Sequence, residues 1–369
     1  MPEATWLSTH SASFLVTFGA TAAVGEIPSG WQPSQEALVA ESCRIFVTRP
    51  IPEAARQRLC QACLNIEVNA EDRGLTRDEL IRNLRDRDAV LTFLTDRIDA
   101  EIIEGGGELR VIANCAVGFD NIDVRAATAR GIIVTNTPDV LTDATADLAW
   151  ALLMAVVRRV VEADRLVRAG KFRGWEPGLL LGSDLVGKTL AVIGTGRVGS
   201  AFAMRSKGFN MRVVYVDERP NDALERELGA RRVDLETALR EADFVSLHVP
   251  LTPDTRHFIG AERLGMMKPT AYLVNTARGA VVDEAALVQA LREKRIAGAA
   301  LDVFENEPQL TDGLAELDNV VLAPHIGSAT VETRTRMIML AAENVFAAMR
   351  GEAPPNIVNR EVVEDRNGR

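Results

Sequence analysis

Three polar side chains that could act together on a small acid follow three short apolar runs late in the chain. Arg278 comes after the run 271–275, the acidic stretch 302–307 continues the run 298–303, and His325 comes after the run 320–323. An arginine can hold a carboxylate with two parallel hydrogen bonds, and a histidine exchanges a proton near neutral pH. If the runs are parallel strands, their carboxyl ends share the sheet edge that binds ligands. The set therefore suits reduction of a keto acid.

The other three histidines are weaker candidates for this chemistry. His10 lies in the N-terminal stretch, and His257 stands among polar residues and is predicted at the surface. His248 ends the apolar run 244–249, where it is either structural or close to a cofactor. Each member of the set could singly be a surface ion-pairing residue, but three consecutive strand ends favour a site.

A glycine-rich turn follows another apolar run, 189–193. Its sequence is Gly194-Thr195-Gly196-Arg197-Val198-Gly199, and a helical pattern continues to Gly208. In such a turn the first glycine permits the tight bend, the second lets backbone approach a pyrophosphate, and the third lets the helix pack closely on the strand. The free amides and positive dipole end of the helix then attract the phosphates. The turn predicts a dinucleotide site.

An acidic residue in the right place indicates which dinucleotide binds. Asp217 ends the run 212–216, 18 residues after Gly199, where a carboxylate usually binds the ribose hydroxyls of NAD. A carboxylate there repels the 2′-phosphate of NADP, so we expect NAD. Two alternatives stay open: Arg219 could meet that phosphate, and Asp217 could be a solvated residue at the strand end.

The elements that must position these residues alternate between short β-branched runs and amphipathic helical segments. This alternation predicts an α/β protein with two doubly wound parallel sheets. Strands are expected at 44–48, 66–69, 89–94, 110–116, 132–136, 189–193, 212–216, 244–249, 271–275, 298–303 and 320–323. Helices are expected at 52–63, 76–86, 99–104, 121–130, 142–169 and 329–349, with a capping box at Thr76 and Glu79.

The chain is long enough for two domains, and the pattern suggests that one is discontinuous. We expect a substrate-binding domain over 43–138 and 325–360, with the last helix returning to it, and a dinucleotide-binding domain over 139–324. Residues 1–42 show no periodicity and read as an extension. The stretch 14–25 is too short for a membrane span and has no basic residue before it, so neither a span nor a secretory signal is expected.

Composition excludes several classes of partner. The 369 residues carry 42 Lys and Arg against 52 Asp and Glu, a net charge of −10. An acidic surface argues against nucleic acid and anionic membrane, so an anionic substrate needs a local positive site. Four cysteines build no disulfide framework, and Cys60 and Cys63 are interpreted as two buried small residues on a helix rather than a metal site.

The sequence resembles the D-isomer-specific 2-hydroxyacid dehydrogenases, and within them the glyoxylate/hydroxypyruvate reductases. The resemblance covers about residues 43–360 and implies a flavodoxin-like substrate domain beside a Rossmann domain. The motifs that carry it are Asn114-Cys115-Ala116-Val117-Gly118-Phe119-Asp120-Asn121-Ile122-Asp123, Thr135-Asn136-Thr137-Pro138, the glycine turn, Asn275–Gly279, Asp302–Pro308 and Pro324–Ser328.

The resemblance implies a role for each matching residue. His325 matches the general acid/base, Glu307 its carboxylate partner (with Glu305 as competitor), and Arg278 the substrate-binding arginine. The remaining substrate residues implied are Leu94, Val117, Gly118 and Trp175, the last reaching toward a neighbouring subunit. The cofactor residues are Gly194, Thr195, Gly196, Arg197, Val198, Gly199, Asp217, Glu218, Arg219, His248, Val249, Pro250, Thr276, Ala277, Arg278, Asp302, His325 and Gly327. Asp302 would orient the carboxamide, and no metal is expected.

The implied activity is reduction of a small 2-keto acid to the D-2-hydroxy acid by a cytoplasmic homodimer that uses NAD, with NADP less favoured. Phosphite dehydrogenases are similar but carry a lysine where this chain has Val117. Phosphoglycerate dehydrogenases often append a regulatory domain, and nothing beyond Glu352 is long enough for one. A non-enzymatic NAD(H)-sensing corepressor on the same fold is the alternative from another class.

Overall fold

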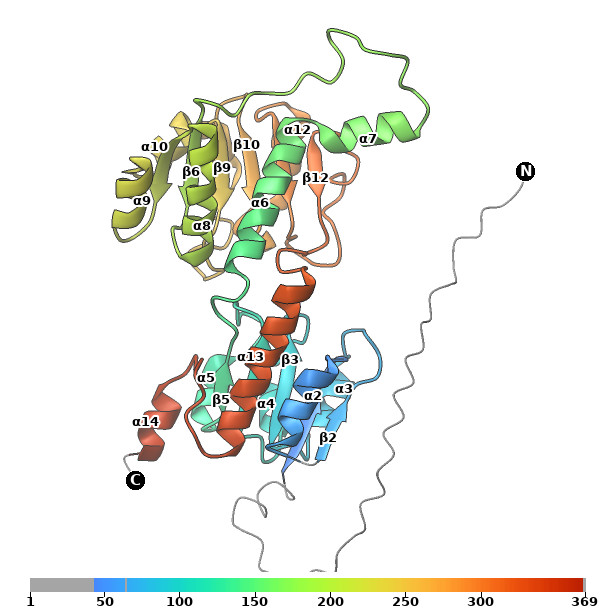
Figure 1. The fold of residues 1–369 in the computed structure, drawn as a ribbon, viewed down its shortest axis with the longest axis vertical. Coiled ribbons are helices and arrows are strands. Elements are labelled where there is room, and N and C mark those ends of the chain that lie inside the picture. The colour runs from blue at the N-terminus through green and yellow to red at the C-terminus, as the bar shows by residue number, and fades with distance from the viewer. Residues whose placement is uncertain (1–42, 64, 368–369) are drawn as a thin grey trace, which may run out of the picture.

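The computed structural model describes residues 43–63 and 65–367, and these form two lobes, each built on a parallel β-sheet (Figure 1). The extension 1–42, with His10 and the stretch 14–25, lies outside the described residues. Both sheets are covered by helices on their two faces, because most residues of the inner strands are buried and apolar. The predicted α/β class with two doubly wound parallel sheets is confirmed.

The first sheet has five strands in the order β2-β1-β3-β4-β5. Its strands are β1 (Arg44–Val47), β2 (Asn65–Val68), β3 (Ala89–Phe93), β4 (Val111–Cys115) and β5 (Ile133–Thr135). The helices between them are α2 (Glu53–Cys60), α3 (Arg77–Leu84), α4 (Ala100–Gly105) and α5 (Val124–Ala129). The predicted capping box starts α3, where the Thr76 hydroxyl and the Glu79 carboxylate each accept a backbone N–H.

The second sheet has seven strands in the order β12-β11-β10-β9-β6-β7-β8. They are β6 (Thr189–Ile193), β7 (Arg212–Val216), β8 (Arg231–Arg232), β9 (Phe244–Leu247), β10 (Tyr272–Asn275), β11 (Gly298–Leu301) and β12 (Val320–Leu322). Its helices are α6 (Thr142–Val157), α8 (Arg197–Arg205), α9 (Asp222–Leu228), α10 (Leu235–Glu241), α11 (Ala261–Met266) and α12 (Glu284–Arg292). The strand order reverses between β6 and β9, and such a switch point opens a crevice for a ligand.

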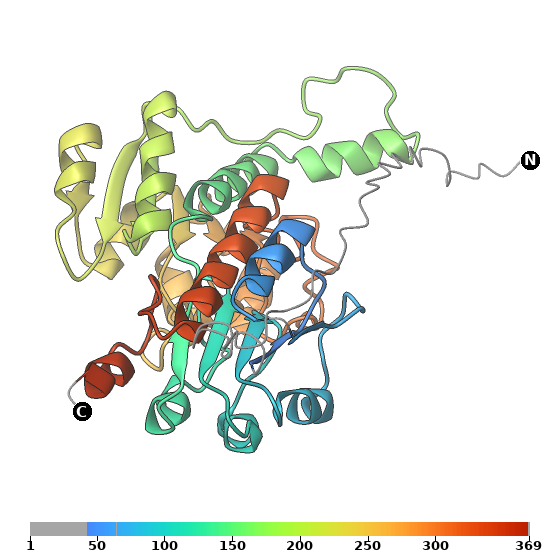
Figure 2. The same cartoon turned by 60° about the horizontal axis from the view of Figure 1, so that its bottom comes forward.

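The prediction for the second lobe is wrong in two details. Six strands were expected in the second sheet, but the two-residue β8 adds a seventh at its edge. The single helix expected over 142–169 is broken at Arg158 and Arg159, where Arg159 adopts a left-handed conformation (φ 52°). The chain continues as α7 (Val160–Arg168) and a loop that project from the second lobe, and the loop returns to that lobe at the buried Leu185 before it ends at Gly187 (Figures 1 and 2). We call residues 160–187 the α7 arm.

Helix α13 (Val331–Met349) comes from the far end of the chain and packs on the first sheet (Figure 2). Met337, Ala341 and Val345 on this helix share a core with Ile45 and Leu91 on the strands. Glu343 accepts two hydrogen bonds of 2.7 Å from Arg58 on α2. The C-terminal segment, ending in α14 (Glu361–Asn367), continues along the same lobe.

The cysteines correct one interpretation. Cys43 and Cys63 are paired in a disulfide, with Cα atoms 5.6 Å apart, and Cys63 lies after the end of α2 rather than on it. Cys60 is half buried and, like the buried Cys115, has a free thiol. No helix within the described residues has the length and apolar character needed to cross a membrane.

Candidate active site

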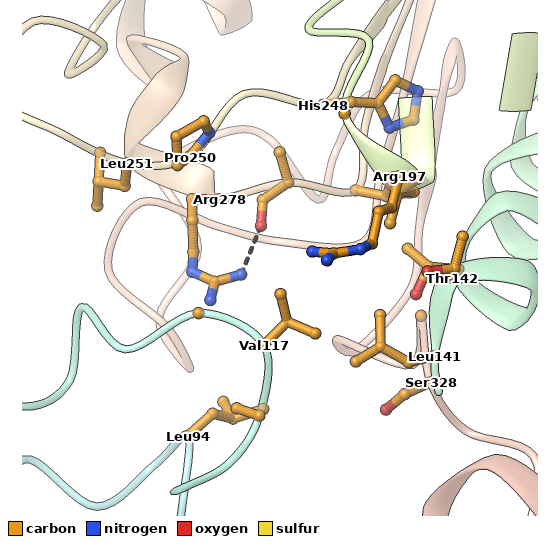
Figure 3. Close-up of a pocket in the computed structure, with 18 of the residues that line it drawn as sticks. Leu94, Val117, Leu141, Thr142, Arg197, His248, Pro250, Leu251, Arg278 and Ser328 are labelled. Carbon is orange, nitrogen blue, oxygen red and sulfur yellow. Dashed lines mark hydrogen bonds between the residues drawn. The ribbon is translucent and has the colours of Figure 1, made fainter. Parts of the chain in front are cut away.

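A cavity of about 370 Å³ lies between the carboxyl ends of the two sheets. Figure 3 shows Leu94 and Val117 on one side of it, facing Arg278 and Pro250 across the opening. Most of the predicted site residues line this cavity: Leu94, Val117, Gly118, Gly196, Arg197, Val198, His248, Val249, Pro250, Thr276, Ala277, Arg278, Asp302, His325 and Gly327. The others, Gly194, Thr195, Gly199, Asp217, Glu218, Arg219, Glu307 and Trp175, lie outside its lining.

A histidine–carboxylate pair stands at one wall of the cavity. Nδ1 of His325 lies 2.9 Å from Oε2 of Glu307, while Oε1 of Glu307 accepts the backbone N–H of Phe304 at 2.9 Å. Burial opposes the charge on Glu307, but the hydrogen bond and charge of His325 outweigh it and lower the pKa of the carboxyl. The pair therefore holds the imidazole by Nδ1, and within the described residues its Nε2 has no hydrogen-bond partner and is available to a ligand.

The competing acid, Glu305, has a different partner. Its carboxylate lies 2.6 Å from Nε2 of His257, and its backbone N–H donates to the buried Glu284 at 2.6 Å. Two histidine–glutamate pairs thus flank one short loop, and only that of Glu307 contains the histidine that lines the cavity.

Asp302 holds the backbone that presents His325. Its two carboxylate oxygens accept the N–H groups of Ile326 and Gly327, each at 2.7 Å. These bonds stabilise the turn in which His325 adopts a positive φ of 55°, a conformation uncommon for a residue with a side chain. Burial raises the pKa of Asp302, in spite of the amides that favour its charge.

Arg278 reaches from the end of β10 toward the other lobe. Its Nε donates to Oδ1 of Asp120 at 2.9 Å and its Nη1 to the carbonyl of Ala277 at 2.8 Å, the bond drawn in Figure 3. Its Nη2 lies so close to Gly118 that a Cβ there would come within 1.6 Å. The free edge of the guanidinium is therefore directed at the loop of Val117 and Gly118.

The glycine turn has the geometry that a dinucleotide needs. Gly194 has a φ of 88°, and a Cβ on Gly199 would lie 2.0 Å from the carbonyl of Gly194, so both positions require glycine. A Cβ on Gly196 would meet nothing within 4 Å, which leaves space for a ligand. Within the described residues, the first amides of α8, at 197–199, donate to no other group, and such amides favour phosphate.

Asp217 is tied to the same turn. It accepts hydrogen bonds from the backbone N–H and hydroxyl of Thr195, at 2.7 and 2.9 Å, and from the N–H of Arg219 at 3.2 Å. Burial works against its charge, but these backbone and hydroxyl bonds prevail and lower its pKa. The carboxylate is therefore negatively charged at neutral pH and stands next to the turn.

His248 lies beneath the glycine turn. Its ring packs against Phe202 and shares a 2.9 Å hydrogen bond with the Ser246 hydroxyl. Burial lowers its pKa to about 3, so it is neutral near pH 7 and cannot supply a proton.

Several cavity residues were missed by sequence reasoning. Asp120 pairs with Arg278 across the two lobes, Asp139 pairs with Arg197, and the lining also includes Leu141, Thr142, Leu251 and Met337. Asp120 lies within the motif 114–123, so the sequence offered a reason to include it among the site residues. Trp175 is 84% exposed on the α7 arm, away from the cavity of its own chain.

The cleft between the two α/β lobes combines a glycine turn of the kind that binds phosphate, an arginine and a histidine–carboxylate pair. These features define the class of nicotinamide-dependent dehydrogenases. Residues 150–327 match the family model of the D-isomer specific 2-hydroxyacid dehydrogenase, NAD binding domain. The chain belongs to this enzyme family.

Relatives extend the likeness over both lobes. A glyoxylate reductase of Korarchaeum cryptofilum is 54% identical over 325 residues, which is 88% of this chain and 98% of that protein. A solved structure from Thermus thermophilus has a TM-score of 0.79 and 47% identity, covering 85% of this chain and 99% of its own. An NADPH-dependent glyoxylate/hydroxypyruvate reductase of Sinorhizobium meliloti, solved with NADP and malonate, has a TM-score of 0.75 and 34% identity, covering 86% and 97%.

Proposed function

We propose that this protein reduces glyoxylate, or a 2-keto acid of similar size such as hydroxypyruvate, to the corresponding 2-hydroxy acid, with the D configuration where that product is chiral. The observation that carries the proposal is the pair of His325 and Glu307 on the same cavity as Arg278, next to the glycine turn. Relatives that are named glyoxylate reductase support a small 2-keto acid as the substrate class.

The residues of the chain divide the chemistry among them. A bound reduced nicotinamide supplies the hydride, and the turn 194–199 with Thr276, Ala277 and Asp302 would hold that cofactor. His325 gives a proton from Nε2 to the carbonyl oxygen, while Glu307 orients and stabilises the imidazolium. Arg278 holds the carboxylate and polarises the carbonyl, and the loop of Val117 and Gly118 offers backbone amides.

We infer that NAD is preferred over NADP. The ionised Asp217 stands where the ribose hydroxyls would lie and would repel a 2′-phosphate. Glu218 adds a second negative charge there. Arg232 keeps its positive charge beside them, but two of its N–H groups already donate to the backbone carbonyls of Asp217 and Glu218, at 3.0 and 2.6 Å. Arg219 and Arg232 are the cations that could favour NADP.

We also propose a homodimer and the domain division given above. The α7 arm exposes Phe172, Trp175, Leu181 and Val186 to solvent, a row of apolar side chains that a second copy could cover. Trp175 would then face the substrate cavity of that copy.

We place the enzyme in the cytoplasm, where a reduction of this kind draws on NADH. The division into 43–138 with 325–360 and 139–324 follows the two sheets.

The test follows the absorbance of NADH, which is lost if glyoxylate or hydroxypyruvate is reduced and is formed from NAD if phosphite or 3-phosphoglycerate is oxidised. We expect turnover of about one per second or faster with glyoxylate or hydroxypyruvate, as is ordinary for enzymes, and slower turnover with NADPH. The phosphite and phosphoglycerate arms, run with NAD, should show none. His325→Ala should lower kcat by about 10²–10⁴-fold while NADH still binds.

Two outcomes would contradict the proposal. NADH binding without turnover of any keto acid would favour the NAD(H)-sensing corepressor. Full activity of the His325→Ala variant would remove the proton donor from the mechanism, and His257→Ala, which alters a histidine outside the cavity lining, is the matched control.

A further inference from the structure

Three consecutive carbonyl groups of the loop beside Arg278 are tied to the body of the first lobe. The carbonyl of Ala116 accepts the backbone N–H of Thr137 at 2.8 Å. The carbonyl of Val117 accepts Nδ2 of Asn136 at 2.8 Å, and that of Gly118 accepts Nδ2 of Asn114 at 2.9 Å. The two asparagine amides thus fix the orientation of two successive peptide planes.

These bonds determine where the N–H groups of the loop point. In a trans peptide the C=O and the following N–H point in opposite directions. The N–H groups of Val117, Gly118 and Phe119 are therefore turned away from Thr137, Asn136 and Asn114. Among the described residues none of these three N–H groups has an acceptor, and all three residues line the cavity. Consecutive free N–H groups of this kind attract an anion.

The neighbours of Asn114 orient its side chain so that Nδ2, and not Oδ1, faces the loop. It is fully buried, and its Nδ2 donates to Gly118 and to Oδ1 of Asn121, while its Oδ1 accepts the Thr92 hydroxyl at 3.3 Å. Asn121 in turn donates to the carbonyls of Phe93 and Asp96, at 3.3 and 3.0 Å. This network joins the loop of Gly118 to the loop that carries Leu94.

Asn136 is fixed from the other end of the chain. Its backbone N–H donates to the carbonyl of Asn356 at 3.2 Å, and its own carbonyl accepts Nδ2 of Asn344 at 3.1 Å. Asn344 is a fully buried residue of α13. Helix α13 therefore holds Asn136, which in turn holds the carbonyl of Val117. In this way the C-terminal part of the lobe is connected to the cavity.

We propose that Asn136 and Asn114 are positioning residues that direct the N–H groups of the loop 117–119 toward the carboxylate of the substrate. The inference rests on the proposed function, because it concerns recognition of the same 2-keto acid. It goes beyond that function in assigning carboxylate affinity to two side chains that contact neither substrate nor cofactor. They act through the loop backbone, together with the guanidinium of Arg278.

The experiment compares Asn136→Ala and Asn136→Asp with the wild-type protein. Asn136→Asp keeps the shape of the side chain but places an oxygen against the carbonyl of Val117. Two affinities are measured: that of NADH by fluorescence, and that of oxamate, a non-reducible 2-keto acid analogue, for the NADH complex by calorimetry. We expect the affinity for oxamate to fall about tenfold and the KM for glyoxylate to rise about tenfold. The affinity for NADH should stay within about twofold, and kcat should change less than KM.

Asn83→Ala is the matched control. Asn83 also donates its side-chain amide to a backbone carbonyl, that of Glu79 at 2.8 Å, but it lies on α3, away from the cavity. It should leave both affinities unchanged. Asn114→Ser serves as the second variant, since a hydroxyl is too short to reach Gly118, and it should weaken oxamate in the same way.

Several results would overturn the inference. Unchanged oxamate affinity in a folded Asn136→Ala or Asn114→Ser protein would do so, as would an equal loss of NADH and oxamate affinity, which indicates general damage. If the Asn136 variants do not fold, the Asn114→Ser result decides. Because oxamate binding needs no turnover, wild-type protein that binds oxamate yet reduces no keto acid contradicts the proposed function alone.

Discussion

The loop 304–308 carries two glutamates that have the same chemistry but different surroundings. Glu307 lies against His325, which lines the cavity, whereas Glu305 lies against His257, which does not. Burial raises the cost of a charge on Glu307, but the adjacent imidazole, with the Phe304 N–H and the charge of Arg278, favours ionisation and lowers the pKa of the carboxyl. The two residues therefore differ in what their removal should do to the proton chemistry.

We predict that Glu307→Gln lowers kcat/KM for reduction and removes the acid limb of its pH profile. The carboxylate holds Nδ1 of His325 and so orients the ring whose proton passes to the carbonyl. Reduction requires that proton. In the wild type, the Glu307 contribution is present above the lowered pKa of its carboxyl and is lost as the pH falls through that value. Without the carboxylate, kcat/KM should be lower at neutral pH and should no longer fall as the pH drops through the pKa of Glu307.

The measurement is kcat/KM for glyoxylate against pH, with Glu305→Gln as the matched variant from the same loop. Glu305→Gln should keep the acid limb of the wild type. An acid limb that stays in place in Glu307→Gln would contradict the assignment of this carboxylate to His325.

Sequence reasoning located the charged residues of the cavity but not the groups that hold them. Strand-end positions are readable because parallel strands share a carboxyl edge, and this brought Arg278, Asp302 and His325 together. The bonds of Asp302 to two backbone amides and of Asn136 to the Val117 carbonyl depend on loop conformation, which has no periodic signal. The asparagines lay within recognised motifs but carry no charge that would single them out.

At the scale of elements, the turn between β6 and α8 separates two kinds of glycine. A side chain on Gly199 would overlap the carbonyl of Gly194, because strand and helix approach closely there, whereas a side chain on Gly196 would enter open space. One position thus serves the packing of the elements and the other the approach of the pyrophosphate.

We therefore predict that Gly199→Ala and Gly196→Ala fail in different measurements. Gly199→Ala should lower the free energy of unfolding by about 1–3 kcal/mol, as overpacking does, measured by urea denaturation. Gly196→Ala should leave stability within about 0.5 kcal/mol but weaken NADH about tenfold or more, measured by fluorescence titration. A Gly196→Ala protein that binds NADH normally would show that the pyrophosphate does not approach this residue.

The elements themselves were predictable where hydrophobic period and length agreed. All eleven expected strands are present within one or two residues at each end, since buried parallel strands read as short β-branched runs. Strand β8 was missed because two arginines carry no such pattern. The break between α6 and α7 was missed because Arg158 and Arg159 are good helix formers, and only the left-handed backbone of Arg159 ends the periodic run.

At the scale of the whole molecule, the most unusual feature is the α7 arm, which leaves the second lobe with little support from its own chain (Figures 1 and 2). None of the residues of α7 is buried, although its valines repeat at helical spacing, and the following loop exposes Trp175 and Leu181. An amphipathic helix with an uncovered apolar face has a free-energy gain available from a partner. A second copy of the same arm is the simplest partner, because a two-fold axis makes one patch complementary to itself.

We predict that Leu181→Asp converts the protein from a dimer to a monomer at micromolar concentration, measured by sedimentation equilibrium. A carboxylate at a covered apolar position would lose its hydration, which costs more than such an interface gains per side chain. Val331→Asp is the control, because Val331 is 81% exposed at the start of α13, outside the arm. If Trp175 reaches the cavity of the second copy, the monomer should also lose keto acid affinity while binding NADH normally. A Leu181→Asp protein that remains dimeric would place the interface elsewhere.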